Sequence, residues 1–175
     1  LSPAWETDLG GRLSSITAAD GSLFVAAVDR HTVYAIDASS GRQLWDYTVG
    51  GRVDSPPTWF DGLVLFGSAD GYVYCLNAAD GQLAWRFLAA RCDRRIMSFE
   101  QIESLWPVHG SILVRDGIAH FVAGRSIFVD GGTLNQTFPA LQAAAMSLSP
   151  MPCPNAPMAP RILACESVDT AVAPG

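Results

Sequence analysis

The segment YAIDASSGRQLW at residues 34–45 returns as YCLNAADGQLAW at residues 74–85, with related residues at most positions. Trp45 and Trp85 therefore stand 40 residues apart, and Trp5 precedes Trp45 by the same interval. A bulky residue, a turn and a β-rich run that recur together at one period indicate an internal structural repeat.

Within each copy the local pattern predicts β-strands. Short, continuous apolar runs at residues 23–28 and 63–67 are typical of strands covered on both faces. Residues 32–36 and 72–76 are rich in β-branched and aromatic residues, which favour strands. The runs are separated by Asp-Gly pairs that begin at Asp20, Asp61, Asp70, Asp80, Asp116 and Asp130. We interpret these pairs as hairpin turns rather than calcium loops, because further carboxylates do not accompany them.

Four strands in about 40 residues match the size of one β-propeller blade. We therefore predict an all-β fold: an incomplete β-propeller with two complete four-stranded blades, part of a third blade and an irregular C-terminal tail. Because a closed propeller needs at least about four blades, we expect an open arc. Its exposed strand edges and apolar faces should make it marginally stable, or prone to aggregate, when it is alone.

The pattern A-x-D-x-x-S-G-R-x-x-W at residues 35–45 resembles the tryptophan-docking motif of pyrroloquinoline-quinone-type, or quinoprotein-like, β-propeller repeats. In that family the pattern is approximately A-x-D-x-x-T-G-x-x-x-W, and the second copy, at residues 75–85, departs from it at three strand or turn positions, Cys75, Asn77 and Asp80. The resemblance implies that each tryptophan docks against the neighbouring blade, where a large ring closes the core between blades. The residues with this purely structural docking role are Trp5, Trp45, Trp85, Gly41 and Gly81.

The repeat is interrupted after Trp85. We interpret residues 90–108 as an insertion before the next blade, with a loop or a short helix around residues 99–102. From residue 93 to residue 132 the chain carries the pattern DRR…ES-x-WPV-x-GS…AGRS…DGG, which is similar to a subgroup of bacterial quinoprotein-like propeller proteins. The activity of that subgroup is not settled, so the similarity implies a fold but little chemistry.

The third blade is predicted to be incomplete. Its first two strands are expected at residues 111–115 and 118–123, and a third is expected near Ile127. We assign residues 1–135 to the propeller blades and residues 136–175 to an Ala/Pro-rich tail, disordered or translated out of frame, in which no strand or docking motif can be traced. We therefore expect a fragment of a larger propeller, with a frameshift or a truncated gene end near this boundary; a natural low-complexity extension is the alternative.

Composition excludes several classes of function. The net charge is −6 and all eleven basic residues are arginine, so a nucleic-acid partner, which needs a clustered positive surface, is not expected. An uncharged stretch at residues 131–160 contains six prolines and is not expected to span a membrane. The four cysteines show no CxxC spacing, so they predict neither a zinc site nor a cellular compartment.

The best polar candidates for a site gather in and after the insertion: Asp93, Arg94, Arg95, Glu103, Trp106, His109 and Arg125. The arginines could bind a small anionic ligand beside a tryptophan platform. The alternative is structural: Glu103 pairs with an arginine and holds the insertion against the blade. No catalytic, cofactor-binding or metal-binding residue can be assigned, because His31, His109 and His120 sit in unrelated contexts.

We expect a binding or scaffold module, comparable to the propeller lipoprotein of the machinery that assembles outer-membrane barrels, rather than an enzyme. The alternative is a fragment of a quinone-dependent alcohol or sugar dehydrogenase. In such dehydrogenases the quinone lies over a calcium ion, often beside a disulfide between adjacent cysteines, and this chain has no adjacent cysteine pair. Pyrroloquinoline quinone and calcium are therefore expected only under the alternative. The resemblance implies an exported, periplasmic protein, whose partners would be the remaining propeller blades and either a protein or a small anionic ligand.

Overall fold

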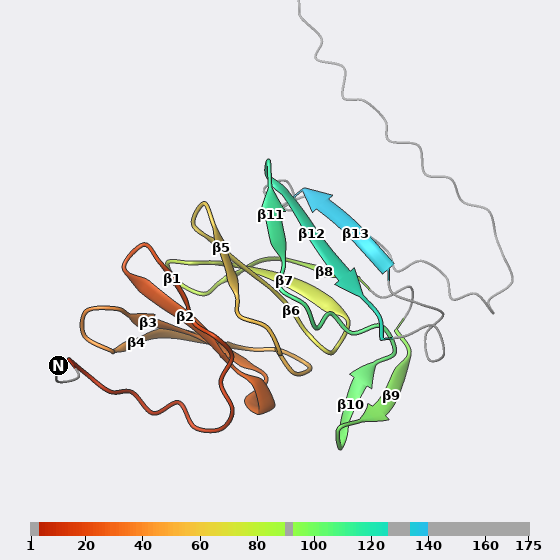
Figure 1. Ribbon diagram of the computed structural model, residues 1–175, viewed down its shortest axis with the longest axis horizontal. Helices are drawn as coiled ribbons and strands as arrows, with labels where there is room; N and C mark the ends of the chain where they lie inside the picture. The colour runs from red at the N-terminus through yellow and green to blue at the C-terminus, as the bar shows by residue number, and fades with distance from the viewer. Residues whose placement is uncertain (1–3, 90–92, 126–133, 140–175) are drawn as a thin grey trace, which may run out of the picture.

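The two copies of the repeat form two four-stranded antiparallel sheets in a computed structural model of the protein, which describes residues 4–89, 93–125 and 134–139 (Figure 1). The first blade consists of β1 (Thr17–Ala19), β2 (Ser22–Ala27), β3 (Thr32–Asp37) and β4 (Gln43–Thr48), with a 3-10 turn, η1 (Val28–Arg30), between β2 and β3. The second blade consists of β5 (Thr58–Phe60), β6 (Leu63–Gly67), β7 (Tyr72–Asn77) and β8 (Leu83–Leu88). In both sheets the strands follow one another in chain order, so the predicted all-β architecture is confirmed.

The two blades are equivalent in detail as well as in outline. Ala35 pairs with Trp45 across β3 and β4, and Cys75 pairs with Trp85 across β7 and β8. In both blades the register shifts immediately after this pair. The period read from the sequence is therefore a true structural repeat.

The third blade contains β11 (Leu113–Arg115), β12 (Ile118–Ala123) and β13 (Leu134–Pro139), paired in that order. The first two of these strands lie where the sequence predicts them. The third was expected near Ile127, which lies outside the described residues. The expectation that no strand can be traced beyond residue 135 is wrong for residues 136–139. These residues lie in β13 because they find backbone partners along β12, with Phe121 opposite Gln136. The tail from residue 140 onward lies outside the described residues.

The insertion contains a β-hairpin, made of β9 (Arg95–Ser98) and β10 (Gln101–Ser104). The prediction of a loop or a short helix around residues 99–102 is therefore wrong. Phe99 and Glu100 form the two-residue turn with φ of 50° and 61°. Two-residue hairpin turns favour positive φ at both positions, and asparagine or glycine are the residues that usually signal it. Because neither of those residues is present, the sequence does not reveal this turn.

Alternate side chains of the second blade pack on opposite neighbours, as its continuous apolar runs predict. Towards the first blade, its Val64, Phe66, Tyr74 and Leu76 share one buried cluster with Phe24, Ala26, Val33 and Ala35. Towards the third blade, its Leu65, Val73 and Cys75 share another cluster with Ala119, Phe121 and Ala123. Hydrophobic layers between blades therefore form the core. In the described part of the chain, no helix has the length and apolarity needed to cross a membrane.

Candidate functional site

Two tryptophans of the repeat, Trp5 and Trp45, each lie on a turn of the blade that follows. Trp45, in the first blade, donates a hydrogen bond from its indole Nε1 to the carbonyl oxygen of Ala78 in the second blade, at 2.8 Å. Trp5 makes the equivalent bond to the carbonyl oxygen of Ala38, at 3.0 Å. A Cβ atom at Gly81 would lie 2.6 Å from the ring of Trp45, so only glycine leaves room for this contact.

Gly41 has the same relation to Trp5 as Gly81 has to Trp45, and its φ is also in the left-handed region, at +70°. The turn that precedes Gly41 is organised by Asp37, whose Oδ1 accepts hydrogen bonds from the backbone and hydroxyl groups of Ser39 and Ser40. The Ser39 and Ser40 hydroxyls and the Ser40 backbone amide lower the pKa of Asp37 to about 2. Trp85 is buried in the core between the second and third blades.

The side chain of Glu103 on β10 lies at the junction of the three blades and is fully buried. Its Oε1 accepts a hydrogen bond from Arg52 Nε at 2.7 Å, and its Oε2 accepts one from Arg125 Nη2. Arg52 lies in the link between β4 and β5, and Arg125 follows β12. Burial raises the pKa of Glu103, but the two arginines outweigh it and hold the pKa below its usual value. We name Glu103, Arg52 and Arg125 the buried ion-pair cluster.

A second, partly exposed group extends the buried ion-pair cluster. Arg52 Nη1 lies 3.2 Å from Asp54 Oδ1, and His109 Nδ1 lies 2.7 Å from Asp54 Oδ2. Arg12 approaches the same carboxylate at 3.9 Å. The hydrogen bond with His109 is the main cause that lowers the pKa of Asp54, and the nearby arginines add to it. The group therefore links Asp54, in the connection between the first two blades, to His109, which directly follows the insertion.

The structure brings only some of the predicted site residues together. Glu103 and Arg125 meet directly, and His109 joins them through Asp54 and Arg52. Arg52 and Asp54 were missed in the sequence, although they lie in the segment RVDS (52–55), which repeats RLSS (12–15). The repeat match is the signal that could have found them.

The other candidates lie apart from the buried ion-pair cluster. Arg95 pairs with Asp93 at 3.0 Å on the surface, and Arg94 is exposed. Trp106 is buried beside Leu105, so it does not offer an open stacking platform. The other two histidines are separate from His109, since His31 lies in the β2–β3 turn and His120 lies in β12.

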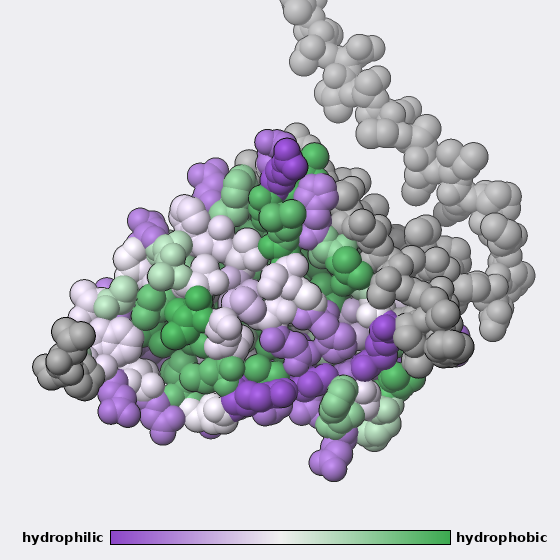
Figure 2. Space-filling view, in the orientation of Figure 1, coloured by the Kyte–Doolittle hydropathy of each residue, from purple (hydrophilic) through white to green (hydrophobic). Residues whose placement is uncertain are grey.

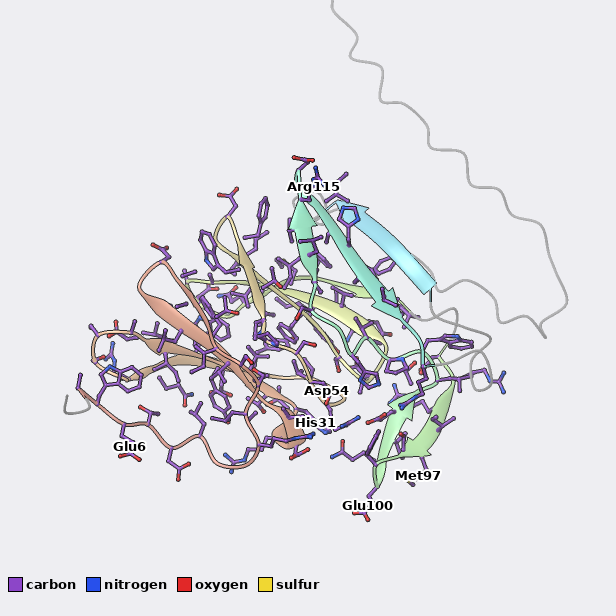
Figure 3. The ribbon with its side chains drawn as sticks, in the orientation of Figure 1. Glu6, His31, Asp54, Met97, Glu100 and Arg115 are labelled. Atoms are coloured by element: carbon purple, nitrogen blue, oxygen red, sulfur yellow. The ribbon has the colours of Figure 1, made fainter. Side chains whose placement is uncertain are left out.

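The β9–β10 hairpin carries an exposed apolar surface. Met97, Phe99 and Ile102, which we name the hairpin patch, have exposed fractions of 72%, 71% and 59%. Figure 2 shows hydrophobic side chains over this hairpin, which projects from one end of the molecule. Figure 3 shows Met97 and Glu100 on the hairpin, on the side of the molecule where His31 and Asp54 lie.

Contacts with the first blade and with the link between β4 and β5 hold the hairpin in place. The guanidinium of Arg52 lies 4.4 Å from the centre of the Phe99 ring, a cation–π contact. His31 Nε2 of the first blade lies 2.9 Å from Gln101 Oε1 of β10. The hairpin patch is therefore presented on a supported element rather than on a free loop.

Backbone hydrogen bonds connect the insertion to the second and third blades. The amide of Ser104 donates to the carbonyl of Ala69 at 2.7 Å, and the amide of Val108 donates to the carbonyl of Ser68 at 3.0 Å. Towards the third blade, the amide of Gly124 donates to the carbonyl of Pro107 at 2.9 Å. Together with His31, these bonds make the insertion contact every blade of the arc.

The site residues do not fit a quinone held over calcium. Calcium needs several oxygen ligands with free lone pairs, and the carboxylates of Glu103 and Asp54 are both paired with arginine. Among the described residues, no group of three or more histidine, cysteine, aspartate and glutamate side chains is placed to hold a metal ion.

Comparison with solved structures shows the fold. The chain is similar to BamB from Moraxella catarrhalis, with a TM-score of 0.58, 19% identity, and coverage of 80% of this chain and 37% of the other. It is also similar to the quinohemoprotein alcohol dehydrogenase ADHIIG from Pseudomonas putida, with a TM-score of 0.60 and 20% identity, over 80% of this chain and 20% of the other. Both likenesses support a β-propeller arc.

Comparison with curated sequences and family models gives the relationship. The chain is 34% identical over 83 residues to the outer membrane protein assembly factor BamB of Burkholderia pseudomallei, which covers 47% of this chain and 22% of that protein. The chain spans about a fifth of the length of the curated relatives that it matches first. A family model described as outer membrane protein assembly factor BamB matches residues 2–132, and the chain therefore belongs to this family.

Proposed function

We propose that the chain acts as a binding or scaffold module whose partner is a protein, and that this partner binds the hairpin patch. The observation that carries the proposal is the exposure of Met97, Phe99 and Ile102 together on one supported hairpin. Protein interfaces concentrate their binding energy in a few aromatic, methionine and arginine residues. Curated relatives named as outer membrane protein assembly factors support a protein partner.

The hairpin patch is suited to binding because its supporting element is already ordered. The inner face of the hairpin is fixed by Glu103, and its tip rests on Arg52. An ordered surface loses little conformational entropy on association, so more of the contact energy appears as affinity. Phe99 also occupies a left-handed backbone conformation that an exposed aromatic residue rarely adopts, which favours a role for its ring.

A protein partner is favoured over a small anionic ligand. The arginines nearest the centre of the site, Arg52 and Arg125, are already paired with Glu103, and Arg52 also contacts Asp54. A small anion would have to displace these carboxylates. We further propose an exported, periplasmic location, which the outer membrane assembly role named for the relatives supports. The remaining propeller blades of a longer protein are proposed as a second kind of partner.

The experiment places a photo-crosslinking amino acid at Met97 of the exported full chain, and a matched probe at Leu44 on β4, which is also exposed. We expect one discrete protein adduct from position 97, none from position 44, and loss of the adduct when Phe99→Ser is added. Equal adducts at both positions, or an adduct that Phe99→Ser does not change, would contradict the proposal.

The second candidate function is a part of a quinone-dependent dehydrogenase, which the fold similarity to a quinohemoprotein alcohol dehydrogenase favours. Its test is spectroscopy of the protein after addition of pyrroloquinoline quinone and calcium. Bound quinone absorbance with dye-linked alcohol oxidation would establish this candidate and overturn the binding module.

A further inference from the structure

Met97 and Ile102 form an outward-facing pair within the hairpin patch. Met97 on β9 lies directly opposite Ile102 on β10, and side chains that oppose each other in an antiparallel pair share one face of the sheet. The next pair, Ile96 and Glu103, faces the other way: Ile96 packs against a buried cluster of the insertion, and Glu103 is fully buried. Met97 therefore belongs to the face of the hairpin that solvent reaches.

The sulfur of Met97 is open to a dissolved oxidant. Met97 has an exposed fraction of 72%, and Figure 3 shows it on the projecting hairpin. In the described part of the chain, the other sulfur atom is that of Cys75, which is buried. Burial raises the pKa of the Cys75 thiol to about 12, so it does not form the thiolate that reacts with oxidants. Of these two sulfur atoms, the one placed to react is that of Met97.

We propose that Met97 is a modification site, at which hydrogen peroxide converts the thioether to a sulfoxide and switches the hairpin patch off. An S–O bond forms as the O–O bond of the peroxide breaks, and the hydroxide that leaves takes the remaining peroxide proton and departs as water. The sulfur loses two electrons and the peroxide gains them. Methionine sulfoxide reductases return the sulfur to the thioether, with two thiols as the reductant, so the modification is reversible.

The sulfoxide changes the surface of the hairpin without unfolding it. Its S–O group is polar, so burying it in an apolar interface costs free energy that the thioether does not. The contacts that hold the hairpin are made by Glu103, Phe99 and Gln101, and none of these uses the Met97 side chain. The inference rests on the proposed function, because it regulates the surface to which that function assigns the partner.

Mass spectrometry of the purified full chain after treatment with hydrogen peroxide tests the modification. Trypsin cleaves after Arg95 and Arg115, so Met97 is released in a peptide, residues 96–115, that contains no other methionine. We expect this peptide to gain one oxygen atom at Met97, at a rate close to that of N-acetylmethionine amide in the same solution. Trp106 in the same peptide is buried and should stay unmodified. A Met97 that stays reduced while the free methionine is consumed would overturn the proposal.

The effect on the hairpin patch is measured with a photo-crosslinking amino acid at Ile102 of the exported full chain, in cells with and without added peroxide. The sulfoxide fraction of Met97 is measured in the same samples. We expect the protein adduct to fall by about tenfold or more once Met97 is oxidised. Met97→Leu is the matched control, because leucine keeps an apolar side chain of similar size but has no sulfur. Its adduct should persist under the same peroxide treatment.

The outcomes separate this inference from the proposed function. An adduct that survives full oxidation of Met97 would overturn the inference alone. So would an equal loss of adduct in Met97→Leu, because the peroxide would then act on another group. Without an adduct from the untreated chain, the proposed function and this inference would both fail.

Discussion

The contact between a tryptophan and a glycine turn is the smallest unit of this architecture. Gly21 and Gly81 both adopt φ of +71°, so replacing either glycine with another residue introduces the same backbone strain. They differ in their surroundings, because Gly21 has open space where a Cβ would lie and Gly81 has the ring of Trp45. The pair therefore separates backbone strain from the effect of docking.

Gly81→Ala is predicted to destabilise the protein more than Gly21→Ala. The control substitution should lower the free energy of unfolding by about 1–2 kcal/mol, the cost of a left-handed alanine. Gly81→Ala should lose a further ~1–3 kcal/mol because the methyl group displaces Trp45. Urea unfolding of both variants, at one protein concentration, measures the difference. Equal losses would show that the docking contact contributes nothing.

The insertion contacts all three blades, and its buried carboxylate, Glu103, makes two of the polar contacts. Glu103 is removed from water but paired with two arginines, Arg52 from the link between the first two blades and Arg125 from the third blade. Its folded pKa is below the usual value of 4.5. A group whose pKa is lowered by folding stabilises the protein above its unfolded pKa, and this stability is lost as the pH falls through the folded pKa.

Glu103→Gln is predicted to lower the free energy of unfolding and to make that free energy depend less on acid pH. In the unmodified protein, the free energy of unfolding should fall once the pH drops below the ordinary glutamate pKa of 4.5, because Glu103 then binds protons in the unfolded state before it does so in the folded state. Glu103→Gln should lose about 3–5 kcal/mol at neutral pH, because it removes the buried negative charge that Arg52 and Arg125 share. The free energy of unfolding of Glu103→Gln should then change less between neutral and acid pH. Asp54, whose pKa is also lowered in the folded protein, accounts for the change that remains.

Asp116→Asn serves as the control for this pH series, because Asp116 is an exposed carboxylate whose nearest arginine contact is 3.7 Å long. It should change neither the stability nor the pH profile by more than about 0.5 kcal/mol. A pH profile of Glu103→Gln that superimposes on that of the unmodified protein would contradict the role of the buried ion-pair cluster.

Local patterns in the sequence predict the blades well, because each blade repeats the same strands and Asp-Gly turns. The runs at residues 23–28 and 63–67 become β2 and β6 because both of their faces are buried. The β9–β10 hairpin was missed because its turn, Phe99–Glu100, lacks the usual turn residues. Part of β13 was missed because its pairing with β12 is set by tertiary contacts rather than by its own composition.

The candidate site was only partly predictable for a similar reason. Glu103, His109 and Arg125 were recognised in the sequence as polar residues in or after the insertion. Pairing of Glu103 with an arginine was one of the two expectations. Which arginine it would meet depends on how the blades pack. Arg52, from the blade connection, reaches Glu103 across 51 positions of the chain, a distance over which spacing carries no information.

The whole molecule is an arc of repeat blades, and the insertion contacts each of them. Hydrophobic layers bind each blade to the next, and residues 93–110 contact all of the blades at one end of the molecule (Figure 1). The third blade leaves Leu113, Ile118 and Val122 exposed at one end of the arc, which is why the chain is expected to be marginally stable when it is alone. The partner binding that we propose at the hairpin patch would depend on the same insertion.

Amide hydrogen exchange of the full chain, with and without Glu103→Gln, tests most directly whether the insertion joins the blades into one unit. The account predicts that the amides of Ser104, Val108 and Gly124 are protected to a similar degree, and that all three lose protection together in Glu103→Gln. Amides within β3 should keep theirs, because β3 is hydrogen-bonded inside the sheet of the first blade. Rapid exchange of the three amides in the unmodified chain, or unchanged protection in the variant, would contradict the account.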